Sequence, residues 1–169
     1  MRYERFEDLP VWKAALELAA RVYALTAKDE FKGRSSLRDQ IERAAVSVSN
    51  NIAEGFERGT TQELLTFIYI ARGSVGEVRS MSCLLERLTL FENLKFEISN
   101  LKSLSGNISR QLRGWADALQ NSEIKGQRYL TDKTRRASRA AREREELLQE
   151  LRRARELNMA KTRKGGSQD

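Results

Sequence analysis

Apolar residues recur at spacings of three and four over most of the first 120 residues, and this periodicity constrains the fold more than any other feature. Residues at these spacings share one face of an α-helix, so each such stretch predicts an amphipathic helix. The composition agrees, because the 169 residues include only 1 Pro and 10 Gly, the two residue types that interrupt helices. The sequence therefore predicts an all-α protein.

The periodic pattern divides into four stretches, which predict helices at about residues 9–27, 35–58, 61–88 and 93–120. The segments between these stretches are short, and helices joined by short connections pack as antiparallel neighbours. We therefore expect an antiparallel up-down four-helix bundle.

Polar residues mark the starts of two of these helices. Asp8 precedes the first helix as a candidate N-cap, and Pro10 fits the first turn, where its missing N–H is not needed. Thr60 followed by Glu63 is a capping box, in which a hydroxyl and a carboxylate satisfy exposed backbone N–H groups. Gly59 before this pair predicts a tight turn between the second and third helices.

Each predicted helix has an apolar stripe that we expect to form the core of the bundle. The expected core positions are Trp12, Ala15, Leu16, Ala19, Val22 and Tyr23 in the first helix, Leu37, Ile41, Ala44, Val48 and Ile52 in the second, Leu64, Ile68, Ala71, Val75, Val78 and Leu85 in the third, and Leu94, Ile98, Leu101, Ile108, Leu112, Trp115 and Leu119 in the fourth.

The third helix carries a second apolar stripe besides these core positions. A helix that is apolar over so wide an arc either lies centrally in its bundle or buries a second face against another subunit. With only four helices in the bundle, we favour a subunit interface. The predicted interface residues are Phe67, Ile70, Met81, Leu84 and Leu88.

Two glycines and two arginines of the third helix need an explanation. Gly73 and Gly76 match the GxxG of a KH-domain loop, but they lie inside a strong helical pattern, so we interpret them as helical. A mid-helix Gly costs about 1 kcal/mol relative to Ala, and close approach of another helix along Gly73, Gly76 and Ser80 would account for the pair. Arg72 and Arg79 share a face, where phosphate contact and pairing with acids both stay open.

A polar patch formed by Asn50, Asn51 and Glu54 lies near the end of the second helix. These side chains could orient a ligand. A hydrogen-bonded network at the end of the bundle is the favoured interpretation, because buried polar groups are usually satisfied within the protein.

Several functional classes are excluded by what the chain lacks. It contains no His, the commonest general base and metal ligand, and Cys83 is its single Cys. No acidic cluster has metal-ligand spacing, and no glycine loop of the Walker type appears. We therefore expect no enzyme, no cofactor and no metal. No apolar run approaches the roughly 20 residues that span a bilayer, so we expect a cytoplasmic protein without membrane contact.

The net charge of the chain is concentrated in its last quarter. Residues 1–124 carry 17 basic and 17 acidic residues, whereas residues 125–169 carry 14 and 7, which accounts for the formal charge of +7. Clustered Lys and Arg bind phosphates and release condensed counterions, which indicates a nucleic-acid partner, RNA or RNA/DNA once the resemblance described below is taken into account. The candidate nucleic-acid-binding residues are Lys125, Arg128, Lys133, Arg135, Arg136, Arg139 and Arg142, together with Arg72 and Arg79 of the bundle.

We divide the chain into the bundle (1–120), a linker (121–131) and a basic helical extension with a disordered end (132–169). A charged helix that only aids solubility remains the alternative interpretation of the extension.

Three stretches resemble a known bacterial family of four-helix bundles. They read FEDLPVW at 6–12, QIERAAVSVSNNIAEG at 40–55 and IARGS at 70–74, and the resemblance covers roughly residues 5–120. The family includes proteins encoded in intervening sequences of large-subunit ribosomal RNA genes. It also includes the accessory variability determinants of diversity-generating retroelements.

The resemblance implies a non-enzymatic bundle that assembles as a barrel-shaped homopentamer. In the retroelement branch it implies a basic platform that binds a reverse transcriptase and its template RNA for mutagenic cDNA synthesis. The neutral body departs from that picture, so positive charge must come from asymmetric placement in the body or from the extension. A structural or protein-interaction scaffold of the ribosomal intervening-sequence type stays open as the alternative function.

Overall fold

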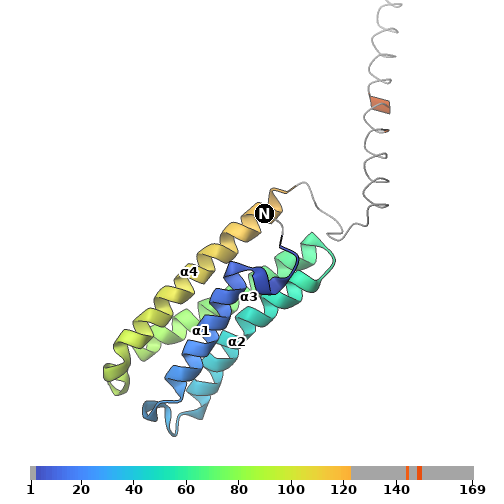
Figure 1. The fold of residues 1–169 in the computed structure, drawn as a ribbon. Helices are drawn as coiled ribbons and strands as arrows, with labels where there is room; N and C mark the ends of the chain where they lie inside the picture. The colour runs from blue at the N-terminus through green and yellow to red at the C-terminus, as the bar shows by residue number, and fades with distance from the viewer. Residues whose placement is uncertain (1–2, 123–143, 145–147, 150–169) are drawn as a thin grey trace, which may run out of the picture. The chain divides into compact units, whose positions relative to one another are not determined.

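A computed structural model describes residues 3–122, 144 and 148–149 of the chain, and residues 3–122 form a helical bundle (Figure 1). This bundle contains α1 (Pro10–Thr26), α2 (Ser35–Glu57), α3 (Thr61–Leu85) and α4 (Lys95–Gln120). Short 3-10 segments precede α1 and connect α1 to α2 and α3 to α4; they are η1 (Phe6–Asp8), η2 (Asp29–Phe31) and η3 (Thr89–Leu94). The predicted all-α fold is confirmed, and the C-terminal ends of three of the four helices lie within one residue of the expected positions.

The four helices run side by side, and helices that follow one another in sequence run in opposite directions (Figure 1). α2 packs against α1 and α3, and α4 packs against α3 and α1. α1 and α3 therefore lie diagonally across the bundle. We call the outer surface between two neighbouring helices a seam; the α1/α2 seam and the α3/α4 seam lie on opposite sides.

The core is filled by aliphatic side chains and closed at one end by two aromatic rings. Phe31 and Phe91 are fully buried where η2 and η3 meet, with ring centroids 4.8 Å apart. All of the predicted core positions are buried or pack against the core except two. Leu16 and Tyr23 are 49% and 50% exposed, so their prediction as core residues was wrong. Each follows a fully buried stripe residue, and one residue rotates a helix by about 100°, which turns both outward.

The two predicted helix starts differ in outcome. At α3 the Thr60 hydroxyl accepts from the Glu63 backbone N–H at 3.2 Å and donates to the Glu63 carboxylate at 2.8 Å, which confirms a cap at this position. At α1 the residue before the helix is Leu9, which makes no side-chain cap bond, and Pro10 occupies the first turn as expected. Asp8 is instead part of η1, so its prediction as the N-cap was wrong.

The end of α3 also differs from the prediction. The helix stops at Leu85 rather than Leu88, because the chain turns there into η3 before α4 begins. Residues Arg87 and Leu88 form this turn, with their N–H groups bonded to the carbonyls of Leu84 and Leu85.

The close approach of two helices occurs at a different glycine from the predicted pair. A Cβ added to Gly73 or Gly76 would meet nothing within 4 Å, so these glycines do not serve helix packing within the bundle, and that prediction was wrong. A Cβ added to Gly55 would lie 2.6 Å from the Phe67 Cβ. α2 and α3 therefore come together at Gly55 because this residue has no side chain.

Candidate interaction surfaces

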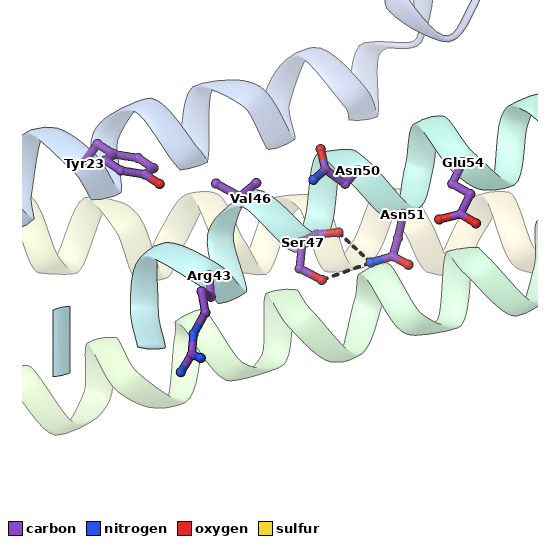
Figure 2. A pocket seen from close by; sticks show the side chains of 7 residues that line it. All are labelled: Tyr23, Arg43, Val46, Ser47, Asn50, Asn51 and Glu54. Carbon is purple, nitrogen blue, oxygen red and sulfur yellow. Dashed lines mark hydrogen bonds between the residues drawn. The ribbon is translucent and has the colours of Figure 1, made fainter. Parts of the chain in front are cut away.

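A shallow hollow of about 400 Å³ lies on the outer surface of α2 (Figure 2). Its floor is organised by one amide, because the Asn51 Nδ2 donates to the Ser47 backbone oxygen at 2.7 Å and to the Ser47 Oγ at 2.9 Å. The Ser47 and Ser74 hydroxyls lie 2.9 Å apart and join α2 to α3. The residues around the hollow are Tyr23, Arg43, Val46, Ser47, Asn50, Asn51 and Glu54.

The three residues of the polar patch predicted on α2 therefore have different roles. Asn51 belongs to a hydrogen-bonded network, as favoured, but the network lies between α2 and α3 rather than at the end of the bundle. The Glu54 carboxylate accepts from the Arg58 guanidinium at 2.7 Å. Asn50 is exposed and its side chain forms no hydrogen bond with any described residue, so its amide is available to a partner.

An apolar strip runs beside this hollow along the α1/α2 seam. Leu16 and Tyr23 are seven residues apart on α1 and about half exposed, and Val46 of α2 lines the hollow beside Tyr23 (Figure 2). Exposed large apolar side chains gathered on one face are typical of protein interaction sites. We call Leu16, Tyr23 and Val46 the α1/α2 strip. Leu16 and Tyr23 were predicted as core residues, so the sequence did not predict this surface.

The second apolar stripe of α3 is only partly available for a subunit contact. Met81 is 7% exposed and belongs to the core, so it cannot serve the interface predicted for it. Phe67 is half-buried, where it packs against Gly55 and lies under the Arg58 guanidinium at 5.3 Å. The bundle itself thus uses both side chains. Three predicted interface residues remain exposed by 46%, 47% and 38%: Ile70, Leu84 and Leu88.

Arg72 and Arg79 both lie on α3 without an acidic partner. Arg72 is half-buried and Arg79 is exposed, and neither side chain forms an ion pair or a hydrogen bond with a described residue. Just after the end of this helix, the Glu86 carboxylate accepts from the Lys102 Nζ of α4 at 2.5 Å, and this bond raises the pKa of Lys102. Of the two interpretations left open for Arg72 and Arg79, pairing with acids is not observed within residues 3–122.

The remaining predicted nucleic-acid-binding residues lie outside the described part of the chain. They are Lys125, Arg128, Lys133, Arg135, Arg136, Arg139 and Arg142. Their role in binding stays a prediction based on charge.

Among the described residues, no three His, Cys, Asp or Glu side chains come close enough together to hold a metal ion. None of the described helices combines the length and the hydropathy that a membrane crossing requires. Cys83 is exposed.

The fold and its surfaces define a class of protein, an up-down four-helix bundle whose seams differ in chemistry. The sequence model for the 23S rRNA-intervening sequence protein family matches residues 7–114, and the chain belongs to this family. The match includes all of α1, α2 and α3 and most of α4, and it ends before the basic extension. No curated protein sequence matches the chain.

Proposed function

We propose that this protein is a non-enzymatic RNA-binding accessory factor that acts as an oligomeric platform. The observation that carries the proposal is the division of charge between a neutral body and an extension with 14 basic and 7 acidic residues. Clustered cations attract a phosphate backbone by releasing its counterions, and this attraction requires no active site. The family name refers to an RNA gene, which agrees with an RNA partner.

The oligomer follows from two apolar surfaces on diagonal helices. The α1/α2 strip lies on one side of the bundle, and Ile70 and Leu84 are exposed on α3, which does not pack against α1. Two different apolar surfaces that are both stabilised by burial favour head-to-tail association of subunits. Such association gives a closed ring when the rotation between neighbouring subunits allows it. The resemblance to pentameric relatives suggests five subunits. A ring would repeat the extension in every subunit and strengthen binding through avidity.

The finer assignment is to a retroelement. In that role the platform would hold a reverse transcriptase and its template RNA during mutagenic cDNA synthesis. The second candidate is a protein-interaction scaffold of the ribosomal intervening-sequence type, and the exposed α1/α2 strip with the uncommitted Asn50 amide favours it. The genes next to this one discriminate between the two: a reverse transcriptase with template and variable repeats supports the first, and a ribosomal RNA locus supports the second.

The RNA-binding proposal is tested by measuring affinity for a single-stranded RNA as a function of salt. The full chain is compared with a chain truncated after Ile124, which lacks the excess of positive charge. Each phosphate contact contributes about 0.7 to the slope of log K against log salt for a single strand. We expect the truncation to lower the slope by several units. An unchanged slope would remove the extension from RNA binding, and a full chain that binds no RNA at 50 mM salt would refute the function.

A further inference from the structure

We propose that the α3/α4 seam is a second binding surface for the phosphate backbone of nucleic acid, formed by Arg72, Arg79, Lys102, Arg110 and Arg113. The inference rests on the proposed RNA-binding function and deepens it. It places part of the contact on the bundle itself, where the total charge of the body is zero. Because the charges of the body sum to zero, a positive surface on the bundle requires that these charges be placed unevenly. The α3/α4 seam would be that positive surface.

The α3 residues are placed on the seam by their spacing. Arg72, Arg79 and the C-cap residue Glu86 follow one another at intervals of seven, and Glu86 keeps helical dihedral angles, so the three lie on one face. Glu86 binds Lys102 of α4 at 2.5 Å, which fixes that face as the one beside α4. The opposite flank of α3 faces α2, since Ser74 contacts Ser47 there. Arg72 and Arg79 therefore lie along the boundary with α4.

Lys102 and Arg113 lie on the matching flank of α4, and Arg110 lies beside them towards the outward side of the helix. Lys102 and Arg113 are eleven residues apart, which is close to three helical turns, so both lie on the side of α4 that faces α3. The Arg110 guanidinium lies over Gly106, with its Nη1 3.6 Å from the position of an added Cβ, and it donates to the neutral Asn107 side chain at 3.2 Å. The α1 side of α4 carries a different set, because Glu97 pairs there with Lys28.

The cations of this seam are poorly neutralised. Two carboxylates occur beside them: Glu86, which binds Lys102, and Asp117, which lies 3.8 Å from Arg113. Arg72, Arg79 and Arg110 pair with no carboxylate among the described residues. Arg72 is half-buried and has no ion-pair partner among the described residues, so a phosphate bound from outside would supply one.

A nucleic-acid strand can closely approach the surface between the cations. A Cβ added to Gly76 would meet nothing within 4 Å, although a Gly inside a helix costs about 1 kcal/mol relative to Ala. Gly106 and Ser109 occupy the corresponding flank of α4. These small residues leave the long Arg side chains free to converge on a strand. From Lys102 to Arg113 the helix rises about 16 Å, enough for the cations to contact more than one phosphate of a strand.

The test uses the full chain with Arg79, Arg110 and Arg113 all changed to Gln. These three are exposed, so the bundle should keep its thermal unfolding midpoint. The matched control changes Lys13, Arg21 and Arg38 to Gln, which removes the same charge from exposed positions on α1 and α2. Affinities for single-stranded RNA and single-stranded DNA of equal length are measured against salt.

We expect the seam variant to lower the slope by about 2 and the control to leave it unchanged, because the seam positions contact phosphates and the control positions do not. A variant with Lys at the same three positions should restore the slope, since phosphate contact needs the charge and not the guanidinium. Equal losses for RNA and DNA identify the phosphates as the ligand, and a larger loss for RNA adds a contact to its 2′-hydroxyls.

Equal slopes for the seam variant and the control, with RNA binding by the wild-type chain intact, would overturn the seam proposal alone. A failure of the wild-type chain to bind RNA would instead refute the proposed function.

Discussion

The α1/α2 seam and the α3/α4 seam belong to the same small bundle but have opposite chemistry. The first presents Leu16, Tyr23 and Val46 beside a hollow whose Arg43 and Glu54 have opposite charges. The second presents arginines with few acids and with glycines between them. A total body charge of zero conceals this division. The comparison teaches that partner chemistry in a bundle is set seam by seam rather than by composition.

The two seams also differ in the partner that each can accommodate. Half-exposed apolar side chains lose contact with water most effectively against another protein surface. Unpaired guanidiniums on a bare helix surface are stabilised most by phosphate. A protein that joins RNA to a protein partner, or to further copies of itself, would use both surfaces at once.

The largest expected effect is on the free energy of unfolding. It distinguishes the close contact between α2 and α3 from the α3/α4 seam, where a glycine has open space around it. Gly55→Ala places a Cβ 2.6 Å from the Phe67 Cβ, so we expect a loss of about 1–3 kcal/mol in the free energy of unfolding. Gly76→Ala is the matched control, and we expect a gain of up to about 1 kcal/mol because nothing lies within 4 Å. Urea unfolding measures both. Equal effects at the two positions would show that α3 is packed equally on both sides.

The next effect concerns the α1/α2 strip. Leu16→Asp combined with Tyr23→Asp should weaken self-association by about 2 kcal/mol, or about 30-fold in dissociation constant, because two apolar contacts are lost. The bundle should remain folded, since both side chains are about half exposed in it.

Sedimentation velocity measures this change in assembly. The control adds the same charge at exposed positions elsewhere, with Ala24→Asp and Ala118→Asp. If the control dissociates the oligomer as strongly as the strip variant, charge and not the strip is responsible. Unaltered assembly of the strip variant would exclude this strip as a subunit interface.

A smaller effect distinguishes the two neighbouring asparagines of the hollow. Asn51→Ala removes the hydrogen bonds to Ser47, so we expect a loss of about 1 kcal/mol in the free energy of unfolding. Asn50→Ala should change it by less than about 0.5 kcal/mol, because Asn50 is exposed and makes no such bond. Thermal unfolding followed by circular dichroism gives both values. A larger loss for Asn50 would mean that its amide already serves the fold.

The smallest effect is on pH dependence and involves the α1/α4 seam. The hydrogen bond from Lys28, together with its charge, holds the pKa of Glu97 below its ordinary value of 4.5. A carboxyl with a lowered folded pKa stabilises the fold above its unfolded pKa, and this contribution is lost as pH falls through the folded value. We expect Glu97→Gln to make stability fall less steeply below about pH 4.5. Unfolding midpoints from pH 3 to pH 6 test this expectation, and parallel curves for the two proteins would contradict it.

The sequence specified the helices well because periodicity and caps are local signals. Thr60 and Glu63 lie three residues apart, so their bond could be predicted without knowledge of the rest of the chain. Leu16 and Tyr23 were misplaced because an apolar side chain at the border of a stripe satisfies the same spacing as one at its centre. Asp8 was misassigned because it belongs to the 3-10 segment η1, which precedes α1. The composition of η1 does not reveal that these residues form a 3-10 turn.

The binding surfaces were less predictable because they depend on which helices become neighbours. Gly55 resembles the other helical glycines in sequence, and only its contact with Phe67 separates it from Gly73 and Gly76. Arg72 and Arg79 could be grouped by their spacing of seven. Arg110 and Arg113 join them through the packing of α4 on α3, and no local pattern links residues so far apart.

The up-down order of the helices has a consequence for how the protein is made. Each helix packs against those that precede or follow it in the sequence. The one additional contact joins the first helix, α1, to the last, α4, and completes the bundle formed by residues 3–122. Bundles with such local contacts fold within milliseconds, far faster than a ribosome adds residues. We therefore expect residues 3–122 to complete their fold while the basic extension is still being synthesised. Under the proposed function, RNA would then first meet a finished bundle.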